Sequence, residues 1–115
     1  DFVTYVTKQI YGDGSTPGDF ANSCSNTAYC PTIGAWAREK GVYTTDSSQV
    51  EPGDYILYGG AGDEYHIGIV TSVNPDGTVN TIEGNTSDDN GNYTDGVVNQ
   101  HSNRTGAYVL MHELA

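Results

Sequence analysis

Residues 66–85 read HIGIVTSVNPDGTVNTIEGN, and this stretch decides the fold of the chain. Apolar and polar residues alternate with a period of two on both sides of residues 74–77, and the Pro and Gly of that segment are typical of a hairpin turn. The pattern predicts two antiparallel strands joined by a tight turn. The simplest register places Val73 opposite Thr78.

This register gathers polar residues on one face of the hairpin. It places His66 opposite Asn85 and Gly68 opposite Glu83. Opposed residues share a face of a sheet, and alternate residues return to it, so His66, Glu83 and Asn85 are expected to project from the same side. The other side is expected to face the core and carries Ile67, Ile69, Val73 and Ile82.

Further elements surround the hairpin. Strands are expected over residues 55–58, 97–101 and 107–114, and the periodicity before them is helical over residues 2–12 and 31–41. Because the helices precede an antiparallel meander, the sequence predicts an α+β domain with N-terminal helices packed on the sheet.

The second helical segment carries clear boundary signals. Pro31 suits a first helical position, and Gly41 suits a position just past the helix end. Ile33, Trp36 and Ala37 share one face, so we expect Trp36 in the core and not on a sugar-binding surface.

Composition narrows the class of protein. The chain has 115 residues, which suits one domain, and 15 acidic against 4 basic side chains give it a net charge of −11. Nucleic acid is therefore an unfavourable partner, because its binding needs clustered Lys and Arg. No apolar run is long enough to span a membrane, and the composition fits an exported bacterial protein.

His66 and Glu83 allow two interpretations. Both can be solvated side chains at strand ends. Alternatively, Glu83 or Asn85 accepts a hydrogen bond from the imidazole and fixes its tautomer, so that the other ring nitrogen acts as a general base. Such a base needs a nucleophile, and a thiol or hydroxyl at a helix N-terminus would be suited to that role.

The segments PGDYILY, HIGIVTSV and TVNTIEGNTS, in this order, resemble the CHAP domain, the cysteine- and histidine-dependent amidohydrolase/peptidase family with a papain-like fold. The resemblance covers most of the chain. It implies that His66 is the general base and that Glu83 and Asn85 orient it, and it implies no cofactor. It also implies that residues 1–115 form a single CHAP-like domain.

The chain departs from the family pattern at its start. Family members carry their nucleophile in a pattern like C-A-x-F-V at the start of the first helix, and this chain begins DFVTYV. The nucleophilic cysteine is therefore expected two places before Asp1. Cys30, which precedes Pro31 at a helix start, is a less favoured substitute. Cys24 and Cys30 are expected either to form a small disulfide-closed loop or to remain two thiols.

Four ring-bearing side chains and one polar loop complete the set of candidates. Tyr58 and Tyr65 are candidates to line a substrate groove. His101 and His112 are expected to have structural roles, and residues 87–92 form a solvated loop with a faint likeness to a calcium-binding loop. No cysteine pair meets a histidine pair at zinc-ligand spacing, so no metal site is expected.

The resemblance implies a cell-wall hydrolase of bacterial or phage origin. It would cleave a peptidoglycan amide bond, either between N-acetylmuramic acid and L-alanine, as an amidase, or within the peptide, as an endopeptidase. The protein would be secreted, and a separate wall-binding domain in the parent protein is plausible for an acidic enzyme on an anionic wall. Two alternatives are an inactive binding module with the same fold and an exported toxin with amidase chemistry.

Overall fold

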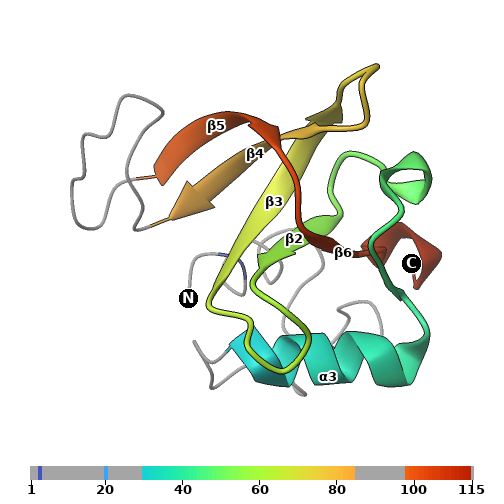
Figure 1. Ribbon diagram of the computed structural model, residues 1–115. Helices are drawn as coiled ribbons and strands as arrows, with labels where there is room; N and C mark the ends of the chain where they lie inside the picture. Colours follow the sequence, from blue (N-terminus) through green and yellow to red (C-terminus); the bar gives the residue numbers. More distant parts are fainter. Residues whose placement is uncertain (1–2, 4–19, 21–29, 85–97, 115) are drawn as a thin grey trace.

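The computed structural model describes residues 3, 20, 30–84 and 98–114, and they form one curved antiparallel sheet with a helix beside it (Figure 1). The elements are α3 (Cys30–Lys40), β1 (Tyr43–Thr44), the 3-10 helix η2 (Ser47–Gln49), β2 (Tyr55–Tyr58), β3 (His66–Val73), β4 (Val79–Gly84), β5 (Val98–Arg104), β6 (Ala107–Val109) and the 3-10 helix η3 (Met111–Glu113). The α+β class is confirmed. Of the expected N-terminal helices, the structure describes the bounds of α3 alone. The expected helix over residues 2–12 lies outside the described residues, apart from the buried Val3.

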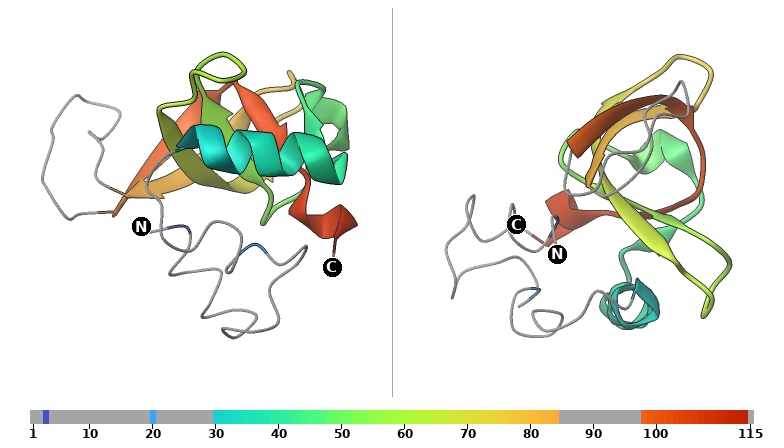
Figure 2. Two further views of the ribbon diagram at one scale, coloured as in Figure 1. Left: turned by 90° about the horizontal axis from the view of Figure 1, so that it is seen from below. Right: turned by 90° about the vertical axis from the view of Figure 1, so that its left-hand side faces the viewer.

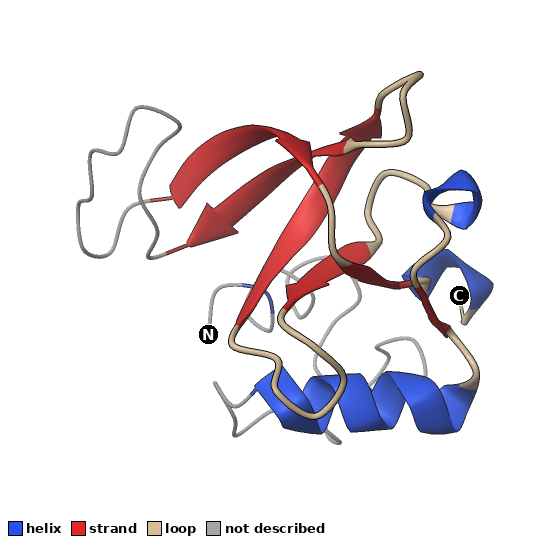
Figure 3. Ribbon diagram, in the orientation of Figure 1, coloured by secondary structure: helices blue, strands red, loops and turns tan. Residues whose placement is uncertain are grey.

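The sheet order is β1-β6-β2-β3-β4-β5, and every pair of neighbours is antiparallel (Figure 3). The predicted meander is confirmed for β2 to β5. It is wrong for the last strand. β6 does not follow β5 in the sheet but crosses back and pairs with the edge of β2 that faces away from β3. The expected strand over residues 107–114 is also too long, since it turns into η3 after Val109.

The helix α3 packs on one side of the sheet (Figure 2). Ile33, Trp36 and Ala37 are buried as predicted, and Phe20 contacts Trp36 edge-on at a ring-centroid distance of 5.3 Å. Gly41, with φ of 74°, ends the helix, and the Val42 N–H reaches back to the Ala37 carbonyl at 3.0 Å. These are the contacts of a Schellman cap.

The β3–β4 hairpin departs from the predicted register and then returns to it. Val73 pairs with Val79 and not with Thr78, because the turn contains five residues, with the Asn74 N–H donating to the Thr78 carbonyl at 2.8 Å. A bulge between Val70 and Ser72 shifts the register back by one residue. At Val70 and Ile69 the predicted pairing therefore holds, and these residues lie in the half of the hairpin that carries His66.

The prediction that the hairpin has one core face and one polar face is wrong in part. Ile67 is buried and Ile69 and Ile82 are half-buried, but Val73 is 37% exposed. The bulge is the reason, because Val73 pairs with Val79 and so lies on the face of His66 and not on that of Ile67. On β4 the more buried residues are Val79, Thr81 and Glu83, which share a face with His66. Both faces of the sheet therefore contribute to the core.

No helix within residues 30–84 and 98–114 is long and apolar enough to cross a membrane.

Candidate active site

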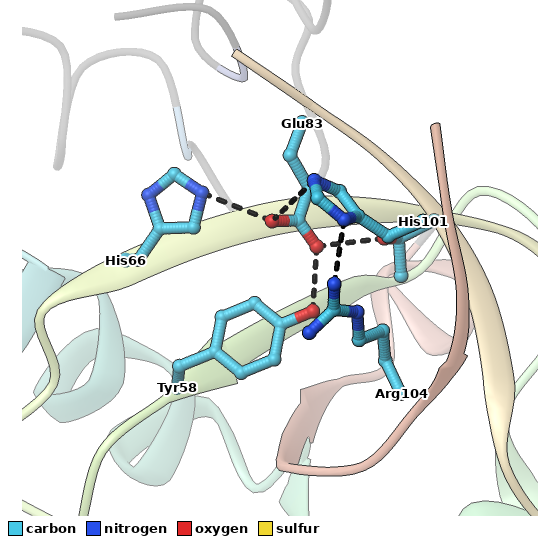
Figure 4. A network of polar contacts seen from close by, with 6 residues as sticks. Tyr58, His66, Glu83, His101 and Arg104 are labelled. Atoms are coloured by element: carbon cyan, nitrogen blue, oxygen red, sulfur yellow. Dashed lines mark hydrogen bonds and ion pairs between the residues drawn. The ribbon is translucent and has the colours of Figure 1, made fainter. Parts of the chain in front are cut away.

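Glu83 lies at the centre of a polar network on the face that β2, β3, β4 and β5 share (Figure 4). Its side chain is almost fully buried. Its Oε2 accepts hydrogen bonds from the Tyr58 hydroxyl at 2.5 Å and the Thr81 hydroxyl at 2.6 Å, and its Oε1 lies 3.1 Å from His66 Nε2. Three side chains therefore hold this carboxylate in one position.

These hydrogen bonds keep Glu83 ionised. Burial alone raises the pKa of a carboxyl group, but the hydrogen bonds from His66, Thr81 and Tyr58 outweigh burial and lower the pKa of Glu83 from 4.5 to about 2. Burial and the neighbouring carboxylate raise the pKa of the Tyr58 phenol well above its ordinary value. Tyr58 therefore acts as a permanent donor to Glu83.

The Glu83 carboxylate also fixes the orientation of His66. An ionised carboxylate only accepts hydrogen bonds, so His66 Nε2 is the donor, and in the neutral ring the lone pair is on Nδ1. The ring stacks on Tyr58 at a centroid distance of 5.9 Å, and its side chain is 26% exposed. His66 thus presents a basic nitrogen on the side away from Glu83 (Figure 4).

Gly68 makes room for the Glu83 side chain. The two residues are opposite each other in the predicted register, and a Cβ built on Gly68 would lie 2.6 Å from Glu83 Cγ and 3.0 Å from Oε2. Any larger residue would force the carboxylate away from its partners. The glycine two positions after His66 is therefore required by the path of the glutamate.

The network opens into a small cavity of about 150 Å³. It is lined by Tyr58, Tyr65, His66, Glu83, His101 and Arg104. Tyr65 is 74% exposed and stacks on Tyr58 at 6.5 Å. The cavity combines a basic nitrogen, a fixed carboxylate and an exposed aromatic ring.

The family model of the CHAP domain matches residues 1–85, which is most of the chain and includes His66 and Glu83. The chain belongs to the CHAP domain family. CHAP domains are typically cysteine- and histidine-dependent amidohydrolases or peptidases that act on peptidoglycan. No curated protein and no solved structure matches the chain.

In this CHAP domain the structure brings His66, Glu83 and Tyr58 together, and Tyr65 flanks them. Asn85 directly follows β4 and lies outside the described residues, so its position relative to His66 stays a prediction. The faintly calcium-like segment 87–92 also lies outside them.

Cys30 has the properties of a core residue. It is the first residue of α3 and is buried. Burial, with the nearby charge of Glu64 in second place, raises the pKa of its thiol. A raised pKa disfavours the thiolate that a nucleophile needs. Cys24 lies outside the described residues, so a Cys24–Cys30 disulfide stays a prediction.

An ion pair between a buried carboxylate and an exposed guanidinium connects the loop before His66 to the helix. The Glu64 side chain is fully buried, and its carboxylate accepts from Arg38 of α3 at 2.9 Å and from the Gly62 N–H at 2.9 Å. A Cβ on Gly34 would lie 1.9 Å from Glu64 Oε2, so this glycine lets the carboxylate reach the helix. No local pattern in the sequence indicates this contact, because Arg38 and Glu64 are 26 positions apart along the chain.

His101 and Arg104 of β5 belong to the site, and sequence reasoning did not place them there. His101 is buried, and its Nε2 lies 3.9 Å from Glu83 Oε1, while its Nδ1 lies 2.6 Å from an Arg104 nitrogen. Knowledge of the β4–β5 register would have predicted that His101 lies near Glu83, because His101 is opposite Thr81. However, 13 residues separate β4 from β5, and no turn signal fixes the register across so long a connection.

His112 has the structural role that was expected. Its Nδ1 lies 2.7 Å from the buried Asp54 carboxylate, and its backbone N–H donates to the same carboxylate at 3.0 Å.

Proposed function

We propose that this CHAP domain hydrolyses an amide bond of peptidoglycan by cysteine-dependent acyl transfer, with His66 as the general base and then the general acid. One observation supports this most strongly. His66 donates Nε2–H to a buried, ionised Glu83, which leaves the basic Nδ1 available to a thiol. The same arrangement stabilises the imidazolium that forms when His66 accepts a proton.

The proposed reaction has two steps, which are acylation of the thiol and hydrolysis of the thioester. His66 Nδ1 takes the thiol proton, the thiolate attacks the carbonyl carbon, and the protonated imidazole gives its proton to the departing amine. Water, deprotonated by His66, then attacks the thioester, and the thiolate leaves and recovers its proton. We propose that the nucleophile is a cysteine two places before Asp1 in the parent protein, and that Asn85 assists Glu83 in orienting His66.

The substrate side of the proposal is supported by the shape of the site. The cavity is small and Tyr65 at its edge is well exposed, which suits a short peptide held at an open surface better than a deeply enclosed ligand. The bond is proposed to be the muramoyl–alanine amide or one within the peptide. The protein would act outside the cell, with a separate wall-binding domain compensating for the repulsion between an acidic domain and an anionic wall.

The test is amine release from purified cell walls by the full-length protein and its His66→Ala variant. Removal of a general base typically costs about 100-fold or more in rate, so we expect turnover to be nearly abolished while the circular dichroism spectrum is unchanged. His112→Gln is the matched control, because His112 lies outside the cavity, and it should retain turnover. Full turnover by His66→Ala would reject the proposal.

The nucleophile requires its own comparison. Ser, Ala or Gly two places before Asp1 would exclude the thiol mechanism and favour a binding module. Loss of turnover in Cys30→Ala, with folding intact, would instead assign the thiol to α3.

A further inference from the structure

Two imidazole rings face the same carboxylate oxygen. Glu83 Oε1 lies 3.1 Å from His66 Nε2 and 3.9 Å from His101 Nε2 (Figure 4). Either ring could in principle form the ion pair with Glu83 when protonated. A site with one catalytic base needs a means of keeping the second ring neutral.

Arg104 provides that means through its contact with the far side of His101. A guanidinium nitrogen is always a donor, so the 2.6 Å contact requires a lone pair on His101 Nδ1. The proton of the neutral ring must then be on Nε2, directed at Glu83. A protonated His101 would instead place an N–H and a positive charge directly against the guanidinium, which is unfavourable.

We propose that Arg104 and His101 are positioning residues that keep Glu83 available to His66 alone. Arg104 holds His101 as the neutral Nε2–H tautomer. The ring then contributes only a dipole toward Oε1, and the full ion pair is left to form between Glu83 and His66.

The surroundings of His101 agree with this assignment. The titratable or charged groups that line the cavity with it are Tyr58 of β2, His66 of β3, Glu83 of β4 and Arg104 of β5. Glu83 alone among these favours a proton on His101, and Arg104 is the group in direct contact that opposes it. Without Arg104 the carboxylate would promote protonation of His101, and the two rings would compete for one oxygen.

The direct test is the ¹⁵N NMR spectrum of the imidazole rings in the full-length protein and in Arg104→Met. In the wild type we expect the His101 ring to be neutral, with its proton on Nε2, because Arg104 donates to Nδ1. In Arg104→Met we expect the signal of a protonated Nδ1 to appear as the pH is lowered, because the donor that faces this nitrogen has been removed. Lys40→Met, which removes the same charge from the exposed end of α3, should leave His101 as in the wild type.

Arg104→Lys separates the hydrogen bond from simple packing, because an ammonium group also only donates. We expect this variant to restore the neutral Nε2–H ring. A wild-type His101 that carries its proton on Nδ1, or that is protonated at neutral pH, would overturn the proposal.

The consequence for turnover rests on the proposed function. Arg104→Met should lower kcat/KM about tenfold at a low assay pH and by less than about twofold at a high one, because raising the pH favours the neutral ring. An equal loss at both pH values would mean that Arg104 is only structural and would overturn the proposal. If the wild type releases no amines, the proposed function fails, while the ring spectra still decide the tautomer.

Discussion

The Gly68→Ala substitution probes the space that Glu83 occupies. The new methyl group would lie 2.6 Å from Glu83 Cγ, whereas carbon atoms in contact normally lie about 3.5–4.0 Å apart. The glutamate must therefore retreat by about 1 Å. A shift of this size would carry Oε1 beyond hydrogen-bond distance of His66, since the present separation is 3.1 Å.

The cost can be estimated from two contributions. Overpacking a closely packed site costs about 1–3 kcal/mol, and a charge-assisted hydrogen bond contributes about 1.5–3 kcal/mol. Replacing a strand glycine by alanine returns about 0.5–1 kcal/mol. We expect Gly68→Ala to lower the free energy of unfolding by about 1.5–5.5 kcal/mol and to reduce turnover sharply.

Urea denaturation measures the first effect and amine release from cell walls measures the second. Gly60→Ala is the matched control, because a Cβ at Gly60 meets nothing within 4 Å, and Gly60 is not among the glycines with positive φ. If Gly68→Ala were as stable and as active as Gly60→Ala, the placement of Glu83 over Gly68 would be wrong.

Two further predictions concern buried carboxylates. Because folding lowers the pKa of Glu83 from 4.5 to about 2, its contribution to stability is fully present above about pH 4.5 and is lost as the pH falls toward 2. The loss of folding stability amounts to about 3 kcal/mol. When unfolding is measured as a function of acid pH, Glu83→Gln should lack this loss. The same acid dependence of stability in both proteins would contradict the prediction. Gly34→Ala should displace the buried Glu64 carboxylate from Arg38 and destabilise the fold by about 1–3 kcal/mol, as expected for overpacking. An unchanged urea midpoint would refute that contact.

The hairpin shows how far sequence reasoning reaches. The alternation and the turn residues predicted the strands, and the placement of His66 and Glu83 on one face followed from them. The predicted turn register was wrong by one residue, and the bulge between Val70 and Ser72 cancelled that error. A bulge of this kind leaves no clear mark in a single sequence.

The remaining parts of the site depend on long-range pairing. His101 and Arg104 reach Glu83 because β5 pairs with β4 across a 13-residue connection, and β6 crosses back to β2. Local periodicity identifies such strands without ordering them. Tyr58 was expected as a groove residue, but its hydrogen bond to Glu83 became visible only when the β2–β3 register placed it opposite His66.

The most direct test of the central claim is the kcat/KM of the full-length protein for amide cleavage in purified cell walls, compared with its His66→Ala variant. The account predicts a loss of about 100-fold or more with folding intact, because His66 supplies the basic nitrogen and Glu83 fixes its orientation. A His66→Ala protein that cleaves walls at the wild-type rate would contradict it.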